Sequence, residues 1–153
     1  ILNWGKYNRL ICSARINQLD EIFLIEKTSF TRPWTKNQIK KDLQDCLSSE
    51  NWVYELNGNV VGYIFVSKIE DQFHLNNIAV HPDFLEKKIG SSLIKHIIMR
   101  AKNRKVKFIL LEVSINNISA RKCYKSLGFV KVGVRRNYYS KGDDAILYDL
   151  EIA

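Results

Sequence analysis

The dipeptide Asn57-Gly58 constrains the fold of this chain more than any other short feature. It lies between two apolar runs, 52–56 and 60–67. Asn and Gly both tolerate the positive φ angles of a type I′ turn, which joins two antiparallel strands with the twist that strands prefer. The sequence therefore predicts a β-hairpin over 52–67, with 73–80 as a further strand.

Apolar residues recur at helical spacing before this hairpin, and they predict two helices. Their apolar faces carry Leu19, Ile22 and Phe23 in the first helix and Ile39, Leu43 and Cys46 in the second. Thr35 and Gln38 have the spacing of a capping box, so the second helix is expected to begin there.

The second half of the chain alternates between strand and helix patterns. Pro82 cannot continue a ladder, so the chain should leave the sheet there. From Gly90 onward one helical face collects Leu93, Ile94, Ile97, Ile98 and Ala101, and the polar run 102–105 ends it. We then expect a strand at 107–114, a short helix from Asn116 or Asn117 to Leu127 with Gly128 as its C-cap, and two strands at 129–134 and 145–152 around a turn at 140–144. A strand at 10–16 is a further candidate.

These elements predict an α/β fold in which helices lie on the faces of a mixed sheet. No Gly/Ser/Pro-rich linker or internal repeat divides the 153 residues, so one domain over 1–153 is expected. No apolar run approaches the ~18–20 residues that cross a bilayer. Residues 1–15 contain polar and basic residues among the apolar ones, so they do not resemble a secretory signal peptide. A cytoplasmic protein without a membrane partner is expected.

The charge and the cysteines exclude less. The net charge of +8, from 24 basic and 16 acidic residues, fits a basic surface for nucleic acid, a ribosome or an acidic cofactor, and it fits a mere compositional bias equally well. Cys12, Cys46 and Cys123 are odd in number and widely spaced, which excludes a closed disulfide framework and a paired zinc motif. Reduced thiols buried as small apolar side chains are expected.

The junction 81–92, where a strand leads into a helix, is a candidate phosphate site. A helix N-terminus presents unpaired backbone N–H groups and the positive end of the helix dipole. Gly90 would permit close backbone approach, and Lys87 and Lys88 would add positive charge. The alternative is an ordinary loop with one glycine and two solvated lysines.

Glu112 and Tyr124 are the residues best suited to proton transfer. Glu112 lies in an otherwise apolar strand, where partial burial would raise its pKa and make it a candidate general base; a structural salt bridge is the alternative. Tyr124 shares a helical face with Ala120 and Leu127, which is typical of a core tyrosine, but a phenol at the rim could also protonate a leaving thiolate.

The run 135–139, Arg-Arg-Asn-Tyr-Tyr, places cations beside aromatic rings. Such runs bind single-stranded nucleic acid by stacking. Strand alternation, however, would send Arg135, Asn137 and Tyr139 to one side and Arg136 and Tyr138 to the other, as in an ordinary exposed strand.

The order of these motifs resembles the GNAT superfamily of acetyl-CoA-dependent N-acetyltransferases over nearly the whole chain. The resemblance is carried by 111–129, which holds LEV, NN, A, Y and SLGF at the family's spacings, by RRNYY, by Asp144-Ala145, and by 29–34 before a capped helix. Within the superfamily these motifs are most similar to the bacterial enzymes that acetylate the N-terminal alanine of a ribosomal protein.

The resemblance implies a mostly antiparallel sheet with two splayed central parallel strands, helices on both faces and no metal. Glu112 would be the general base and Tyr124 the general acid. Acetyl-CoA would be bound by Ile78, Ala79 and Val80 through their backbone, by Glu86, Lys87, Lys88, Ile89, Gly90 and Ser91 as the pyrophosphate loop, and by Asn117. Tyr138 and Tyr139 would contact the substrate, a protein N-terminus. The reaction would not require nucleic acid.

The sequence departs from the family pattern at two places that leave alternatives open. Lys88 replaces a glycine of the pyrophosphate loop, and Ser114 stands where the family often has Arg. One alternative is an acetyltransferase for lysine or a small amine, and another is a non-catalytic module that binds RNA or a ribosomal partner.

Overall fold

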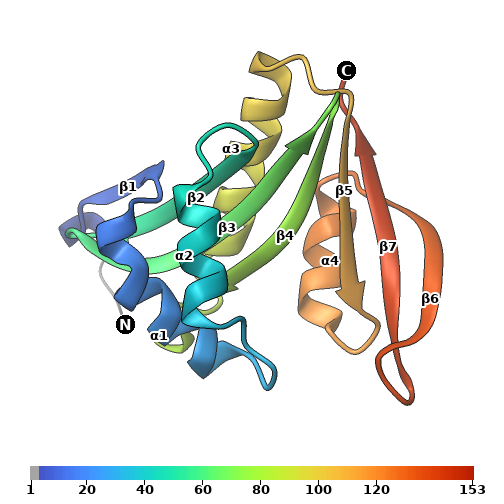
Figure 1. The fold of residues 1–153 in the computed structure, drawn as a ribbon, viewed down its shortest axis with the longest axis horizontal. Coiled ribbons are helices and arrows are strands. Elements are labelled where there is room, and N and C mark those ends of the chain that lie inside the picture. Colours follow the sequence, from blue (N-terminus) through green and yellow to red (C-terminus); the bar gives the residue numbers. More distant parts are fainter. Residues whose placement is uncertain (1–3) are drawn as a thin grey trace. The chain divides into compact units, whose positions relative to one another are not determined.

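The computed structural model describes residues 4–153 (Figure 1). Its strands and helices follow the predicted order, and the strand predicted near residue 10 is present. They are β1 (Arg9–Ser13), α1 (Leu19–Ser29), α2 (Lys36–Gln44), β2 (Ser49–Leu56), β3 (Asn59–Ile69), β4 (Gln72–Val80), α3 (Ile89–Asn103), β5 (Phe108–Ser114), α4 (Ile118–Ser126), β6 (Val130–Ser140) and β7 (Asp143–Glu151). The prediction about a signal peptide concerns residues 1–15, of which 1–3 lie outside the described residues.

Seven strands form one sheet in the order β1-β2-β3-β4-β5-β7-β6. The pairs β1–β2, β5–β7 and β6–β7 are antiparallel, and β4 pairs with β5 in parallel through Gln72–His74 and Phe108–Leu110. The predicted α/β class, with a mostly antiparallel sheet and a central parallel pair, is confirmed. No helix within residues 4–153 is long and apolar enough to cross a membrane.

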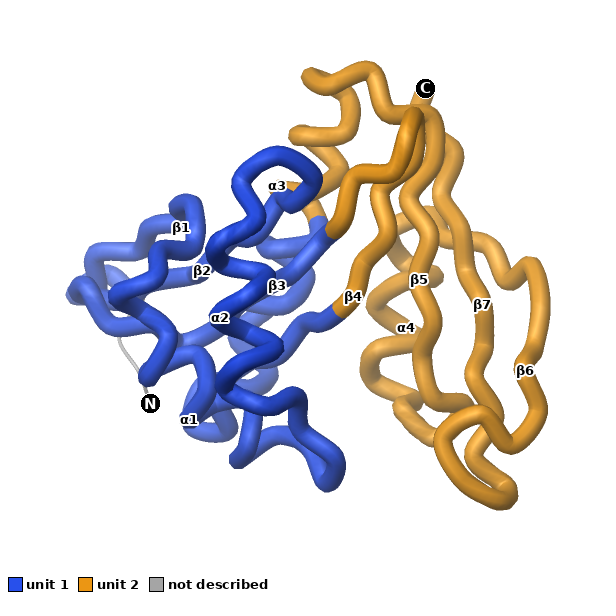
Figure 2. The backbone as a smooth tube through the Cα atoms, viewed as in Figure 1, with its two compact units in different colours: residues 1–66, 77–94 blue, residues 67–76, 95–153 orange. Residues whose placement is uncertain are grey.

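The chain divides into two compact units (Figure 2). Unit 1 contains residues 1–66 and 77–94, and unit 2 contains residues 67–76 and 95–153. Two strands, β3 and β4, and the helix α3 therefore contribute residues to both. The single domain over 1–153 stays a prediction.

Unit 1 is built around the predicted hairpin. Asn57 and Gly58 both have positive φ, +51° and +83°, as the turn requires. On one face of β3, Tyr63 and Phe65 pack in a cluster with α1 and α2. On the other face a Cβ added to Gly62 would lie 3.0 Å from Ile89 Cγ2, so glycine permits the first turn of α3 to approach the strand. Helices thus cover both faces of β3, as predicted.

The second helix begins as predicted and ends earlier than predicted. Gln38 N–H donates to Thr35 Oγ1 at 3.1 Å, and Thr35 N–H donates to Gln38 Oε1 at 2.7 Å, which completes the capping box. The helix stops at Gln44 because the Asp45 carboxylate accepts hydrogen bonds from Leu47 and Ser48 in a turn. The prediction that Cys46 lies on the buried face of this helix is therefore wrong, and its side chain is exposed.

A buried carboxylate joins three segments of unit 1. Glu26 is only 1% exposed although its side chain is polar. Its Oε1 accepts hydrogen bonds from Tyr63 Oη at 2.5 Å and from Asn77 Nδ2 at 2.6 Å, and its Oε2 accepts one from Trp34 N at 2.9 Å. These bonds connect α1 to β3, to β4 and to the loop before α2, and they satisfy a group that would otherwise be costly to bury.

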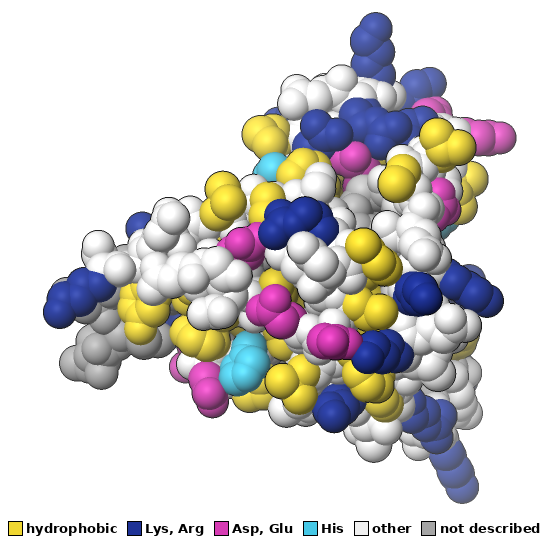
Figure 3. All heavy atoms as spheres, turned by 60° about the vertical axis from the view of Figure 1, so that its left-hand side comes forward, with side chains coloured by type: hydrophobic (Ala, Val, Ile, Leu, Met, Phe, Trp, Pro, Cys, Tyr) yellow, Lys and Arg dark blue, Asp and Glu magenta, His cyan; other side chains and the backbone are white. Residues whose placement is uncertain are grey.

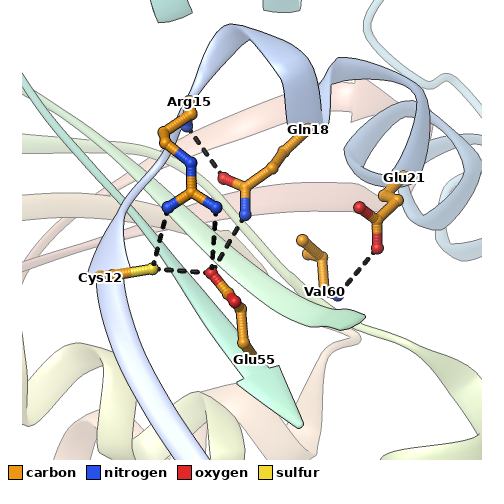
Figure 4. Close-up of polar contacts among 6 residues, drawn as sticks. All are labelled: Cys12, Arg15, Gln18, Glu21, Glu55 and Val60. Carbon is orange, nitrogen blue, oxygen red and sulfur yellow. Dashed lines mark hydrogen bonds and ion pairs between the residues drawn. The ribbon is translucent and has the colours of Figure 1, made fainter. Parts of the chain in front are cut away.

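A second polar cluster of unit 1 surrounds Glu55 on β2 (Figure 4). Cys12 Sγ donates to Glu55 Oε2 at 2.7 Å, and Gln18 Nε2 donates to the same oxygen at 3.1 Å. Burial raises the pKa of the Cys12 thiol, and the neighbouring Glu55 carboxylate adds to that shift. None of the three cysteines, all in the described part, forms a disulfide, but Cys12 and Cys123 are only partly buried.

In unit 2, α4 and the β6–β7 hairpin follow β5. Asn117 caps α4, since its Oδ1 accepts from Ala120 N at 3.2 Å, and Gly128 ends the segment with φ of +98°. The two final strands are longer than predicted, because β6 continues to Ser140 and β7 starts at Asp143. The β6–β7 register shifts twice, between Lys131 and Gly133 and between Arg135 and Ser140.

Candidate active site

The predicted phosphate loop, 86–91, lies in unit 1; its residues 86–88 precede α3, and 89–91 form the first turn of that helix. Two of its non-glycine residues, Glu86 and Lys88, have left-handed backbone conformations, with φ of +63° and +61°. Lys88 O accepts hydrogen bonds from both Ser92 N and Ser92 Oγ, at 3.0 and 2.9 Å, which fixes the loop to the first turn of the helix. At Gly90 an added Cβ would find only Val80 Cγ2, at 3.8 Å, so the backbone there is open. Because its φ is positive, Lys88 has a backbone conformation that a glycine would adopt more easily.

We expect Lys88→Gly to stabilise unit 1. A non-glycine residue in the left-handed region carries strain of about 1 kcal/mol, which glycine relieves. Urea denaturation should show a higher free energy of unfolding by up to about 1 kcal/mol. Lys87→Gly is the matched control: Lys87 does not have a positive φ, so the change should lower that free energy. Equal effects of the two substitutions would contradict the assignment of strain to Lys88.

The segment Ile78–Val80 forms the end of β4 in unit 1. Ala79 is 7% exposed, while Ile78 and Val80 are half-buried. The next residue, His81, donates its N–H to Val61 O at 2.7 Å, and the 3-10 helix Pro82–Phe84 then carries the chain out of the sheet, as predicted for Pro82. The predicted cofactor contacts of 78–80 stay a prediction.

Glu112 lies on β5 in unit 2 and forms an ion pair. Its Oε1 is 3.2 Å from Arg135 Nη2, and its side chain is 31% exposed. The guanidinium of Arg135 also lies over the ring of Tyr138, with 5.4 Å from Cζ to the ring centroid. Tyr138 meets Tyr139 edge to face at 5.0 Å. The salt bridge that was the alternative for Glu112 is therefore present, and its role as a base stays a prediction.

The strand alternation predicted for 135–139 is wrong. Asn137 has φ of +52°, its N–H donates to Asp144 Oδ1 at 2.8 Å, and its Oδ1 accepts from Gly142 N at 2.7 Å. These bonds hold a left-handed residue in the middle of the run and shift the register. As a result Arg135 and Tyr138, three residues apart, contact each other.

Burial and nearby charge act on Tyr139. Burial raises the pKa of its phenol, and the Glu112 carboxylate adds to this shift. The ring of Tyr139 contacts that of Tyr138, which lies against Arg135, the ion-pair partner of Glu112. Of the predicted site residues, Glu112, Tyr138 and Tyr139 are thus gathered in one cluster. Arg135 belongs to the same cluster and was not predicted, although its position beside the tyrosines in the sequence was the available signal.

Tyr124 is packed inside unit 2. It is 4% exposed, and its ring lies 5.8 Å from that of Phe129 and 6.3 Å from that of Tyr148. Burial strongly raises the pKa of the Tyr124 phenol, and the nearby Cys123 and Tyr139 side chains add to the shift. The core interpretation is confirmed, and a phenol in this setting keeps its proton at neutral pH, as a general acid must.

The raised pKa of Tyr124 has a consequence for stability at high pH. In the unfolded chain this phenol loses its proton near pH 10, whereas in the folded state it stays neutral to a higher pH. Its contribution is fully present below about pH 10 and is lost as the pH rises from there toward the folded-state value. Urea denaturation between pH 8 and 11 should show this decline, and Tyr124→Phe should make it shallower. An unchanged decline would contradict the burial of this phenol.

Asn117 and Ser114 hold the connection between β5 and α4. The amide oxygen of Asn117 is engaged in the cap of α4, which confirms the capping interpretation. Ser114 Oγ donates to Asp143 Oδ1, and Asn116 Nδ2 donates to the same oxygen at 3.2 Å, so this connection is tied to the start of β7. A contact of Asn117 with a cofactor stays a prediction.

The basic side chains do not form a single patch on the face that Figure 3 shows. Lys and Arg side chains are interspersed there with acidic and hydrophobic ones. In residues 4–153, no three His, Cys, Asp or Glu side chains are placed to hold a metal ion.

Comparison with known proteins identifies the family. A profile of the Acetyltransferase (GNAT) family matches residues 19–129. The chain is 31% identical over 146 residues to the [ribosomal protein bS18]-alanine N-acetyltransferase of Escherichia coli K12, covering 94% of this chain and 97% of that protein.

Solved structures agree with this match. The crystal structure of the E. coli ribosomal-protein-S18-alanine N-acetyltransferase has a TM-score of 0.89 and 29% identity, over 95% of each chain. The structure of yncA from Salmonella typhimurium, solved with acetyl-CoA, has a TM-score of 0.81 at 17% identity, over 95% of this chain and 94% of that one, and shows likeness of fold alone. The family match covers most of the chain, which therefore belongs to the GNAT family of acetyltransferases.

Proposed function

We propose that this chain transfers the acetyl group of acetyl-CoA to the N-terminal α-amine of a protein, and that the acceptor is the N-terminal alanine of ribosomal protein bS18 in the cytoplasm. The observation that carries the proposal is the likeness to the E. coli enzyme of that name, which extends over nearly all of both chains. The cluster of Glu112, Arg135, Tyr138 and Tyr139 in unit 2 supports it, since it offers a carboxylate and phenols suited to an amine substrate.

The residues of unit 1 suit acetyl-CoA. The segment 86–91 leads into α3 through two left-handed residues and has an open Gly90 in the first turn of the helix. Such a helix N-terminus offers backbone N–H groups to a pyrophosphate. Lys87 and Lys88 add positive charge there. The backbone of Ile78, Ala79 and Val80 would hold the pantetheine arm, and the N–H groups of Ala79 and Val80 would polarise the thioester carbonyl. When bound, acetyl-CoA supplies the electrophilic thioester carbon.

In the proposed mechanism, residues of unit 2 transfer the protons. An α-amine is largely protonated near neutral pH and cannot attack until it loses a proton. Glu112 accepts that proton, directly or through a water molecule. Tyr124, whose phenol is protonated at neutral pH, donates a proton to the departing thiolate. Direct attack needs no covalent enzyme intermediate, so Cys123 has no role as a nucleophile. Tyr138 and Tyr139 bind the acceptor peptide beside Glu112.

Intact-mass spectrometry of a peptide panel tests the proposal. The protein is incubated with acetyl-CoA and peptides that begin with Ala, Ser, Met or Gly, each with a free or a blocked α-amine and with an internal lysine. One added acetyl group on free Ala-start peptides alone is the expected result. Acetylation of blocked peptides would replace the proposal with a lysine acetyltransferase. Absence of both acetyl transfer and acetyl-CoA binding, together with salt-sensitive RNA binding, would replace it with a non-catalytic module.

A further inference from the structure

We infer that Arg135 is a positioning residue for the reaction: it holds the carboxylate of Glu112 in the direction from which that carboxylate takes the proton of the amine. This inference rests on the proposed function, because it assumes that Glu112 is the base.

The register of the sheet places both side chains on one face. Glu112 on β5 pairs with Leu147 on β7, and Leu147 pairs with Gly133 on β6. Arg135 lies two residues beyond Gly133, so it shares the face of Gly133 and Glu112. Its side chain extends across β7 to Glu112, with 3.2 Å between Nη2 and Oε1.

The face that Arg135 crosses leaves room for its side chain. Its partner on β7 is Ala145, which is fully buried and has only a methyl group. Gly133 has no side chain at all. A long side chain can therefore cross β7 in contact with the sheet and still present its guanidinium to the carboxylate.

The aromatic residues fix the guanidinium from a second direction. The left-handed Asn137 brings Tyr138 back toward Arg135, so that the ring lies 5.4 Å from Cζ. A guanidinium that pairs with a carboxylate while it lies over an aromatic ring has little freedom to rotate. A lysine in its place would keep the charge but lose the planar guanidinium that makes both contacts.

Positioning matters here because Glu112 is only partly buried. Its side chain is 31% exposed and would otherwise move among several rotamers. A base that is misplaced by about 1 Å can lose on the order of 100-fold in rate. The ion pair restricts Glu112 before the substrate binds.

A double-mutant cycle on kcat tests the inference. Arg135→Gln, Arg135→Lys and Arg136→Gln are made in the wild-type protein, and Arg135→Gln is also made in a Glu112→Gln background. We expect Arg135→Gln to lower kcat by about 10-fold with little change in the KM for acetyl-CoA, and Arg135→Lys to recover part of the loss. In the Glu112→Gln background the same substitution should change kcat by less than about 2-fold, because its effect acts through Glu112.

Arg136 is the matched control, since it is the adjacent exposed arginine of the same strand and the ion pair with Glu112 is formed by Arg135. An equal loss in Arg136→Gln, or an unchanged loss in the Glu112→Gln background, would overturn the inference. The carboxyl-carbon NMR resonance of Glu112 gives a readout independent of activity: it should move in Arg135→Gln and stay in Arg136→Gln. If it moves but the wild-type protein acetylates no peptide, the ion pair stands and the proposed function, with the role that rests on it, fails.

Discussion

Glu112→Gln is expected to lower kcat for acetyl transfer by about 10²- to 10⁴-fold, the range that general-base catalysis contributes. The amide has the shape of the carboxylate but cannot accept the proton of the attacking ammonium. The substitution also removes the charge that faces Arg135. Because Glu112 is 31% and Arg135 54% exposed, that ion pair contributes less than about 1 kcal/mol to stability. Steady-state kinetics of this variant should therefore show a large loss of kcat, whereas urea denaturation should show only a small change in the free energy of unfolding.

Glu151→Gln is the matched control for this prediction. Glu151 is an exposed glutamate at the end of β7, in the same unit. Its substitution should leave kcat within about 2-fold of the wild-type value, as expected for a surface change away from the site. A Glu112→Gln enzyme with more than about a tenth of the wild-type kcat would show that another group removes the proton.

Glu26→Ala is expected to lower the free energy of unfolding by roughly 3–5 kcal/mol. The change leaves three buried donors without their acceptor: Tyr63 Oη, Asn77 Nδ2 and Trp34 N. Each unsatisfied buried donor costs about 1–3 kcal/mol, and water entering the space left by the side chain recovers part of the sum. The total stability of a domain is only about 5–15 kcal/mol, so the variant should be close to its folding limit.

A graded series makes this prediction sharp. Glu26→Gln retains an oxygen for Tyr63 and Asn77 but turns an N–H donor toward Trp34 N, so an intermediate loss of about 1–2 kcal/mol is expected. Glu21→Ala on the same helix removes one hydrogen bond, from Val60 N at 2.9 Å, and should cost about 1 kcal/mol (Figure 4). Urea denaturation of the three variants should give that order. A loss for Glu26→Ala no larger than that for Glu21→Ala would show that the buried network contributes little.

Much of the fold could be predicted because its signals are local. The Asn57-Gly58 turn, the Thr35–Gln38 capping box and the Asn117 cap depend on residues no more than a few positions apart. The end of the second helix was also set locally, but by the Asp45 side chain, whose turn competes with the helical pattern that included Cys46. Boundaries are decided by such competitions, which hydrophobic spacing does not record.

Contacts that span long sequence distances were harder to predict, both in the buried network of Glu26 and in the candidate site. The partners of Glu26 include residues 37 and 51 positions away, and the sequence shows only a carboxylate on the apolar face of a helix beside Ile22 and Ile25. The contact between Arg135 and Tyr138 depends on the left-handed Asn137, whose bonds to Asp144 and Gly142 form only once the hairpin has closed. Periodicity assumes a regular strand and so assigned the side chains of Arg135 and Tyr138 to opposite sides of it.

The irregular β6 also bears on how this protein behaves at high concentration. As the last strand in the sheet order, it has one edge with backbone groups that no further strand pairs, and such an edge invites addition of a strand from another molecule. Its two register shifts interrupt the regular spacing that a foreign strand would need, and Lys131 and Arg136, both exposed, bring like charges together if two copies of β6 align. The irregularity that brings Tyr138 to Arg135 is thus expected also to hinder the addition of a foreign strand at this edge.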